Sequence, residues 1–264
     1  MAIIRNPKPQ RLPRATKWSL RLISLGIFAI CWEIFAHSAK SLLLPSFSQT
    51  LNALGHLLTT RELWEALWIS NQAMVMGFSS AAVLGVATGL LMGRWRAAEK
   101  FLDPYLNVLL VTPMSALIPI IIMATGLGLV SRVLVIFSFA FVVITVNTRA
   151  GLRTLDPNWI EMGHSFGATE RQLWLKILLR GALPAILTGL RLGLARAVTG
   201  MLTVELLLLA LGIGRLILDF EGTFESASLY ATVLVIIAEA VGLMQIFKQL
   251  EKRAAPWLGQ AAIE

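Results

Sequence analysis

Long apolar runs separated by short charged segments restrict the fold of this chain more than any other feature. Hydrophobic residues make up 56% of its 264 positions and charged residues only 14%, whereas soluble domains carry about 25% charged residues. A helix needs about 20 apolar residues to cross the hydrocarbon core of a bilayer. We therefore predict an all-α integral membrane protein with six transmembrane helices, at residues 18–37, 66–93, 105–126, 130–147, 185–211 and 228–247.

The charges between these runs predict the side of the membrane on which each segment lies. Lys and Arg concentrate in cytoplasmic loops of membrane proteins, and most of those in this chain fall in alternate segments. The predicted outer segments hold only Lys40, Arg61, Arg132 and Arg215. We therefore place both termini in the cytoplasm. The predicted parts outside the membrane core (64–248) are a basic tail (1–17), an outer interfacial segment (38–63) and a cytoplasmic tail (249–264).

A charged, amphipathic segment at residues 156–184 separates the fourth span from the fifth. Asp156 is typical of a helix N-cap, and Gly167 can take the left-handed conformation that ends a helix. Thr169 and Gln172 have the spacing of a capping box, which predicts that a second helix begins at once. The pattern therefore predicts a helix, a glycine turn and another helix on the cytoplasmic side.

Both predicted short helices have an apolar face, by their periodicity of three and four residues. The first face holds Trp159, Met162, Gly163 and Phe166, and the second holds Leu173, Trp174, Ile177 and Leu178. Geometry alone fits two interpretations equally, a docking surface for a partner or a connector that lies on the membrane surface.

This segment resembles the "EAA" loop of permease subunits of ABC importers, which docks into the ATPase. The matching positions are Glu161, Met162, Gly163, Gly167, Ile177, Leu179 and Pro184. Met162 and Gly163 replace the two alanines of the motif, and Arg180 replaces its first proline. The resemblance implies a cytoplasmic coupling loop between the fourth and fifth spans, and we call residues 156–184 the coupling loop below.

Residues 40–250 are similar, in the same order, to the sulfonate, nitrate and taurine branch of these permeases. The similar stretches are Leu44-Pro45-Ser46, Gly77-Phe78, Asp103-Pro104, Pro119, Gly126-Leu127-Gly128, Gly189-Leu190-Arg191 and Gly212-Ile213-Gly214. Collinear order makes this resemblance more specific than any single motif.

The resemblance implies a type I importer in the cell inner membrane that carries a small, anionic solute. In such an importer two permease subunits, here expected to be a homodimer, combine with two ATPase subunits and an extracytoplasmic solute-binding protein. The sequence has no G-x-x-x-x-G-K-[ST] phosphate loop. We therefore expect no cofactor and no catalytic or metal site on this chain, with ATP bound by the partner.

Four residues within the spans are candidates for the transport pathway. Pro113 and Pro119 interrupt the hydrogen bonds of the third span, and freed carbonyls at membrane depth are tolerated only against protein or a water-filled cavity. Arg196 and Glu205 are ionisable residues in the fifth span, where charge is costly. We expect Arg196 to face the bundle interior, and Arg191, nearer the cytoplasm, to be an anchor. A simple kink and hydrogen bonds to helix-end carbonyls are the alternatives.

Two rows of small residues predict close helix packing. The second span carries Gly77, Ala81, Gly85, Gly89 and Gly93, and the fifth carries Gly189, Gly193 and Ala197. After the fifth span, Gly212-Ile213-Gly214 and the acidic residues that follow predict an outer loop.

Other function classes fit less well. A membrane enzyme needs convergent nucleophiles or metal ligands, but the three histidines are scattered and neither H-E-x-x-H nor G-x-S-x-G occurs. The net charge of +8 comes from cations that flank apolar runs, so we expect anionic lipid headgroups and not nucleic acid as their partner. A secondary transporter or channel without an ATPase remains the alternative.

Overall fold

The computed structural model describes residues 14–39, 41 and 43–254, and every regular element in that part of the chain is a helix. The all-α prediction is confirmed. The elements are α1 (Arg14–Ala39), α2 (Phe47–Thr59), α3 (Arg61–Arg94), α4 (Arg96–Val111), α5 (Met114–Thr125), α6 (Leu129–Arg153), α7 (Pro157–Ser165), α8 (Glu170–Gln172), the π-helix η1 (Leu173–Leu178), α9 (Leu179–Val204), the π-helix η2 (Glu205–Leu209), α10 (Gly212–Gly222) and α11 (Ser226–Ala254).

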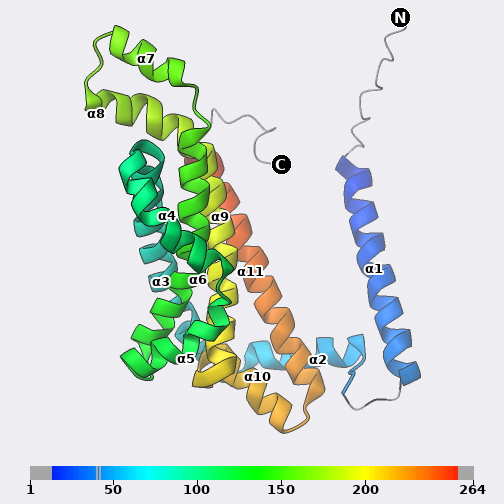
Figure 1. Cartoon of the computed structure of the whole chain (residues 1–264). Helices are drawn as coiled ribbons and strands as arrows, with labels where there is room; N and C mark the ends of the chain where they lie inside the picture. Colours follow the sequence, from blue (N-terminus) through cyan, green and yellow to red (C-terminus); the bar gives the residue numbers. More distant parts are fainter. Residues whose placement is uncertain (1–13, 40, 42, 255–264) are drawn as a thin grey trace, which may run out of the picture.

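Four helical stretches of the described chain are long and apolar enough to cross a membrane. They are Arg61–Arg94, Leu129–Arg153, Glu170–Leu207 and Ser226–Arg253, which cover four of the predicted spans. The apolar part of α1, Ile23–Ala39, is shorter. Figure 1 shows the long helices running side by side, with the coupling loop at one end and α2 and α10 at the other. The chain is therefore a multi-pass membrane protein, whereas the count of six spans stays a prediction.

The predicted third span is not one straight helix. The axes of α4 and α5 differ by 106°, and the break falls at Thr112 and Pro113. Pro113 has no N–H to continue the hydrogen-bond ladder of α4, so the chain turns there and α5 restarts at Met114. Pro119, by contrast, lies within α5 and does not end it. The predicted third span is therefore two helices, which meet at Pro113 and not at Pro119.

Both rows of small residues pack against the same helix, α6. A Cβ added to Gly89 of α3 would lie 2.6 Å from Cβ of Thr148, and one added to Gly193 of α9 would lie 2.5 Å from Cγ1 of Ile144. Contacts this close require glycine, so the predicted close packing is confirmed. As a result, 44% of the most apolar stretch of α6 is buried, against 17% of that of α11. α6 is the central helix of the bundle.

The end of the bundle opposite the coupling loop contains a helix where the sequence predicted an outer loop. α10 begins at Gly212, which has a φ of 58°, and its Ile213 and Leu216 are buried in a cluster with residues of α2, α3 and α11. The two glycines suggested a turn, but only Gly212 forms one. The prediction of an outer loop is therefore wrong for residues 212–222, because tertiary packing of the apolar face stabilises the helix.

The first helix stands apart from the others. Figure 1 shows α1 joined to the bundle through α2. Nε1 of Trp32 donates a hydrogen bond to the carbonyl of Pro45 at 3.0 Å, and Ser48 donates two hydrogen bonds to the carboxylate of Glu33. These contacts fix the turn between α1 and α2, while much of α1 remains exposed.

Candidate coupling loop and transport pathway

The first short helix of the coupling loop has the predicted caps. The Asp156 side chain accepts a hydrogen bond from the N–H of Asn158 at 2.9 Å. At the other end, the N–H of Ala168 donates to the carbonyl of Gly163 at 3.0 Å and that of Gly167 donates to His164 at 2.9 Å. Gly167 has a φ of 70°. This pattern is a Schellman motif, in which the left-handed residue is most often glycine.

The second helix begins at the predicted capping box and then continues into the membrane. Thr169 and Gln172 exchange hydrogen bonds between side chain and backbone. From Glu170 the helix runs through η1 and α9 with no break at residue 185, where we predicted the fifth span to begin. Leu179 and Pro184 are half-buried within α9. The second helix of the coupling loop and the fifth span are therefore one continuous helix.

The first apolar face divides between the inside and the outside of the coupling loop. Gly163 is buried against the second helix, where an added Cβ would lie 2.5 Å from Cδ2 of Leu173 and 2.9 Å from Cδ1 of Ile177. The large apolar residues of the predicted face, Trp159, Met162 and Phe166, are 48%, 51% and 84% exposed. Glu161 is exposed too. Gly163 and Ile177 thus hold the two helices together, and the exposed side chains form an outward surface.

The coupling loop is also anchored to neighbouring helices. The rings of Trp95 and Trp174 lie 5.8 Å apart, and Arg94 lies 3.7 Å from Glu170. Arg149 pairs with Asp103 and Arg153 pairs with Glu99, which joins the end of α6 to α4.

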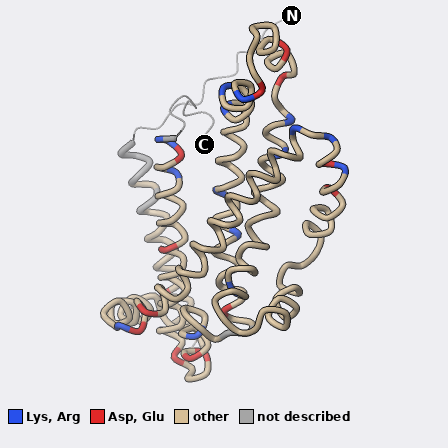
Figure 2. Tube along the Cα trace, turned by 90° about the vertical axis from the view of Figure 1, so that its left-hand side faces the viewer, with Lys and Arg blue, Asp and Glu red and all other residues tan. Residues whose placement is uncertain are grey.

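Figure 2 shows that charged residues gather at the two ends of the bundle, with few along its length.

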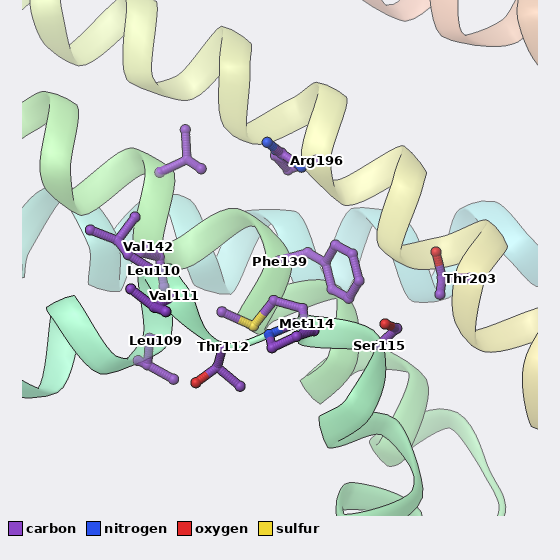
Figure 3. Close-up of a pocket in the computed structure, with 12 residues that line it drawn as sticks. Leu109, Leu110, Val111, Thr112, Met114, Ser115, Phe139, Val142, Arg196 and Thr203 are labelled. Atoms are coloured by element: carbon purple, nitrogen blue, oxygen red, sulfur yellow. The ribbon is translucent and has the colours of Figure 1, made fainter.

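A cavity of about 530 Å³ lies between the turn that joins α4 to α5 and the helices α6 and α9. Figure 3 shows Arg196 and Thr203 on α9, and Thr112, Met114 and Ser115 on the turn across from them. Its other lining residues are Leu109, Leu110, Val111, Pro113, Phe139, Val142 and Val143. Of the four candidate pathway residues, the structure brings only Arg196 and Pro113 together here.

The position of Arg196 differs from the sequence-based expectation. We expected its side chain to face the interior of the bundle, but it is exposed at the open cavity. It has no carboxylate within 4 Å and no hydrogen-bond partner among the residues that the structure describes. Its position follows from the helix period, because Gly193, Ala197 and Gly200 take the side of α9 that packs on α6.

Glu205 lies away from the cavity in a buried polar cluster. Its carboxylate accepts hydrogen bonds from the Ser70 hydroxyl at 2.8 Å and the Gly214 N–H at 3.1 Å. Nη1 of Arg132 lies 3.6 Å from it and also donates to the carbonyl of Ile69 at 3.1 Å. The cluster joins α3, α6, η2 and α10. Pro119 does not line the cavity either.

Arg132 corrects one assignment made from the sequence. We counted it as an outer cation, but it is buried in α6. The only local sign of its burial in the sequence was its position inside an apolar run, shortly after Gly128. Arg191 lies 3.9 Å from the buried Glu251 of α11, so its anchor is a carboxylate of the protein.

Comparisons with known proteins show what the chain is similar to. Residues 81–256 match the family described as binding-protein-dependent transport system inner membrane component. The chain is 26% identical to the taurine transport system permease protein TauC of Escherichia coli, over 95% of this chain and 94% of that protein. It is 27% identical to the "Putative aliphatic sulfonates transport permease protein SsuC" of Bacillus subtilis, over 91% of this chain and 88% of that protein.

A solved structure shows the same fold. An inward-facing structure of the MetNI methionine ABC transporter matches with a TM-score of 0.58 and 20% identity, over 73% of this chain and 94% of that chain. The family match covers the coupling loop and the helices α6, α9 and α11. The chain belongs to the family of binding-protein-dependent transport system inner membrane components.

Proposed function

We propose that this chain is the permease subunit of an ATP-driven ABC importer and forms part of the pathway for a small, anionic solute. The observation that carries the proposal is the coupling loop, a capped helical hairpin at one end of a membrane bundle. Its second helix is continuous with a membrane-spanning helix, so a force applied to the loop would reach the bundle.

Three protein partners follow from this role. An ATPase would bind the coupling loop, an extracytoplasmic binding protein would deliver solute to the opposite end, and a second copy of this chain would complete the pathway. The chain carries no phosphate loop, so in this role another subunit would bind and hydrolyse ATP. We propose a homodimer of the permease, with both termini of each copy in the cytoplasm.

The ATPase contact would involve the outward surface of α7. Glu161 offers a charge, while Trp159, Met162 and Phe166 offer exposed apolar area next to it. Buried aromatic and methionine side chains are common in the core of protein interfaces. Gly167 sets the angle of the turn, and Gly163 and Ile177 hold the two helices together behind that surface. Leu179 and Pro184 lie where the second helix continues into α9. The methionine that replaces an alanine of the motif therefore adds contact area.

The solute that we propose is a sulfonate, taurine-like compound or nitrate. Support comes from the two relatives, whose names specify taurine and aliphatic sulfonates. An exposed arginine at membrane depth, facing a cavity, also fits an anion.

The test compares Gly167→Val and Glu161→Ala with the unchanged chain, expressed with its candidate ATPase. A Cβ at residue 167 would meet no atom within 4 Å, so valine there acts only on the backbone, at a cost of roughly 1 kcal/mol or more. We expect normal membrane levels but reduced ATPase capture and reduced hydrolysis stimulated by the binding protein.

Gly126→Val is the matched control. Gly126 also has a positive φ, 79°, and equally free surroundings, but it lies in the turn between α5 and α6. We expect this variant to capture the ATPase normally. Normal capture by Gly167→Val and Glu161→Ala as well would contradict the role of the coupling loop. If no ATPase copurifies and transport proceeds without ATP, the chain is a secondary transporter or channel.

A further inference from the structure

The membrane-embedded arginines of this chain are not equivalent. Arg132 lies 3.6 Å from Glu205 and Arg191 lies 3.9 Å from Glu251, so each has a carboxylate of the protein beside it. Arg196 has none among the described residues. It lies about 18 Å along the helix from Pro184, too far for its side chain to reach the cytoplasmic interface easily. Arg196 is therefore a cation at membrane depth that is free to bind an anion from outside the chain.

The surroundings of Arg196 limit what that counter-ion can be. Arg196 is the one charged residue that the structure places in the lining of the cavity, and most of the other lining residues are apolar. The cavity of about 530 Å³ has room for a compact anionic head with a short apolar tail. Val111, Met114 and Phe139 supply the apolar surface for such a tail.

The hydroxyl groups of the lining differ in the hydrogen bonds that they already make. Thr112 donates to the carbonyl of Val108 at 2.7 Å, and Thr203 donates to that of Thr199 at 2.7 Å. Ser115 makes no such bond within the described part of the chain, so its hydroxyl can donate to a ligand. Ser115 lies at the start of α5, where the backbone N–H groups have no preceding helical turn to accept them.

We propose that Arg196 and Ser115 form an oxyanion site within the permease, and that it takes the sulfonate head of a short alkanesulfonate while the apolar lining holds the tail. The planar guanidinium can donate two parallel hydrogen bonds to two oxygens of a sulfonate. The Ser115 hydroxyl, on the turn across the cavity, is a further donor in the same lining. The site names the solute chemistry of the proposed function and rests on that function. It makes Arg196 and Ser115 determinants of specificity in this chain, in addition to any selectivity of the binding protein.

Thiol chemistry tests the site on the full chain in lipid bilayers without an ATPase. Cys31 is the only cysteine, so Cys31→Ser with Val111→Cys gives one reporter thiol in the cavity, at a residue that is 84% exposed. The reaction rates of a methanethiosulfonate reagent that carries a sulfonate and of one that carries a trimethylammonium group are compared. We expect Arg196→Gln to lower the ratio of anionic to cationic rate about tenfold, because one nearby charge is removed.

Ethanesulfonate is the ligand probe in the same assay. It should slow modification of the reporter in the parent chain, and should lose this effect in Arg196→Gln and most of it in Ser115→Ala. Arg196→Lys should keep the rate ratio but protect poorly, since an ammonium group cannot form two parallel hydrogen bonds. Arg191→Gln is the control, because it removes a paired arginine from the same helix and should change neither result.

Two outcomes would overturn the proposal. One is an unchanged rate ratio in Arg196→Gln, and the other is protection by ethanesulfonate that does not depend on Arg196 or Ser115. Protection by nitrate but not by ethanesulfonate would reject the alkanesulfonate assignment. None of these outcomes depends on ATPase capture, so failure of this site and failure of the proposed function are distinguishable.

Discussion

At the scale of single residues, the buried pair of Arg132 and Glu205 stands out. Both side chains are removed from solvent, and Oε1 of Glu205 and Nε of Arg132 lack hydrogen-bond partners. The attraction of such a pair is largely offset by the cost of removing two charges from water. Its effect is therefore to fix the arrangement of η2 and α10 against α3 and α6 more than to add stability.

We predict that Glu205→Leu lowers stability strongly, by roughly 3–5 kcal/mol, because it leaves Arg132 buried without a counter-charge. The double variant Arg132→Met with Glu205→Leu should recover much of that loss. The measurement is the apparent Tm of purified protein in detergent. A double variant as unstable as Glu205→Leu alone would show that the polar cluster, and not the unpaired charge, determines stability here.

At the scale of elements, the bundle is organised around α6, which contacts glycines of α3 on one side and glycines of α9 on the other. Helices gain no hydrophobic driving force from association within lipid, so close van der Waals packing has to hold them together. The rows of small residues permit that packing.

We predict that Gly89→Val destabilises the bundle by about 1–3 kcal/mol, the usual cost of overpacking. An added Cβ there would lie 2.7 Å from the carbonyl oxygen of Thr145, which cannot move aside like a flexible side chain. Gly242→Val in α11 is the control, since a Cβ at Gly242 would meet nothing within 4 Å. Apparent Tm and membrane yield are the measurements. Equal Tm values for the two variants would contradict the central role of this contact.

At the scale of the whole molecule, the two ends of the bundle differ in construction. The coupling loop extends from one end, whereas α2 and α10 lie across the other. The positive-inside rule assigns the end with the coupling loop to the cytoplasm. This orientation decides whether the loop can meet an ATPase.

We predict opposite labelling of two exposed positions, Phe166 in the coupling loop and Phe224 after α10. In a Cys31→Ser background, a membrane-impermeant thiol reagent should label Phe224→Cys in cells whose inner membrane is intact. It should label Phe166→Cys only after that membrane is permeabilised. The reverse pattern would place the coupling loop outside and exclude the proposed ATPase contact.

Local sequence determined much of this protein. The length of the apolar runs predicted helices α3, α6, α9 and α11, and residues a few positions apart predicted both caps of α7 and the capping box at Thr169. These features depend on contacts within one turn or on transfer of one segment into lipid, so they can be deduced without knowledge of the fold.

Tertiary structure decided the rest, because it depends on which faces of distant helices meet. Arg132 and Arg196 are the same residue type in apolar runs, yet one pairs with Glu205 and the other faces a cavity. The sequence does not specify this difference, since the pairing of side chains on separate helices follows from packing. Likewise, burial of Ile213 and Leu216 turned a predicted loop into α10. The energy of those contacts exists only once the bundle has assembled, which is why local patterns could not reveal it.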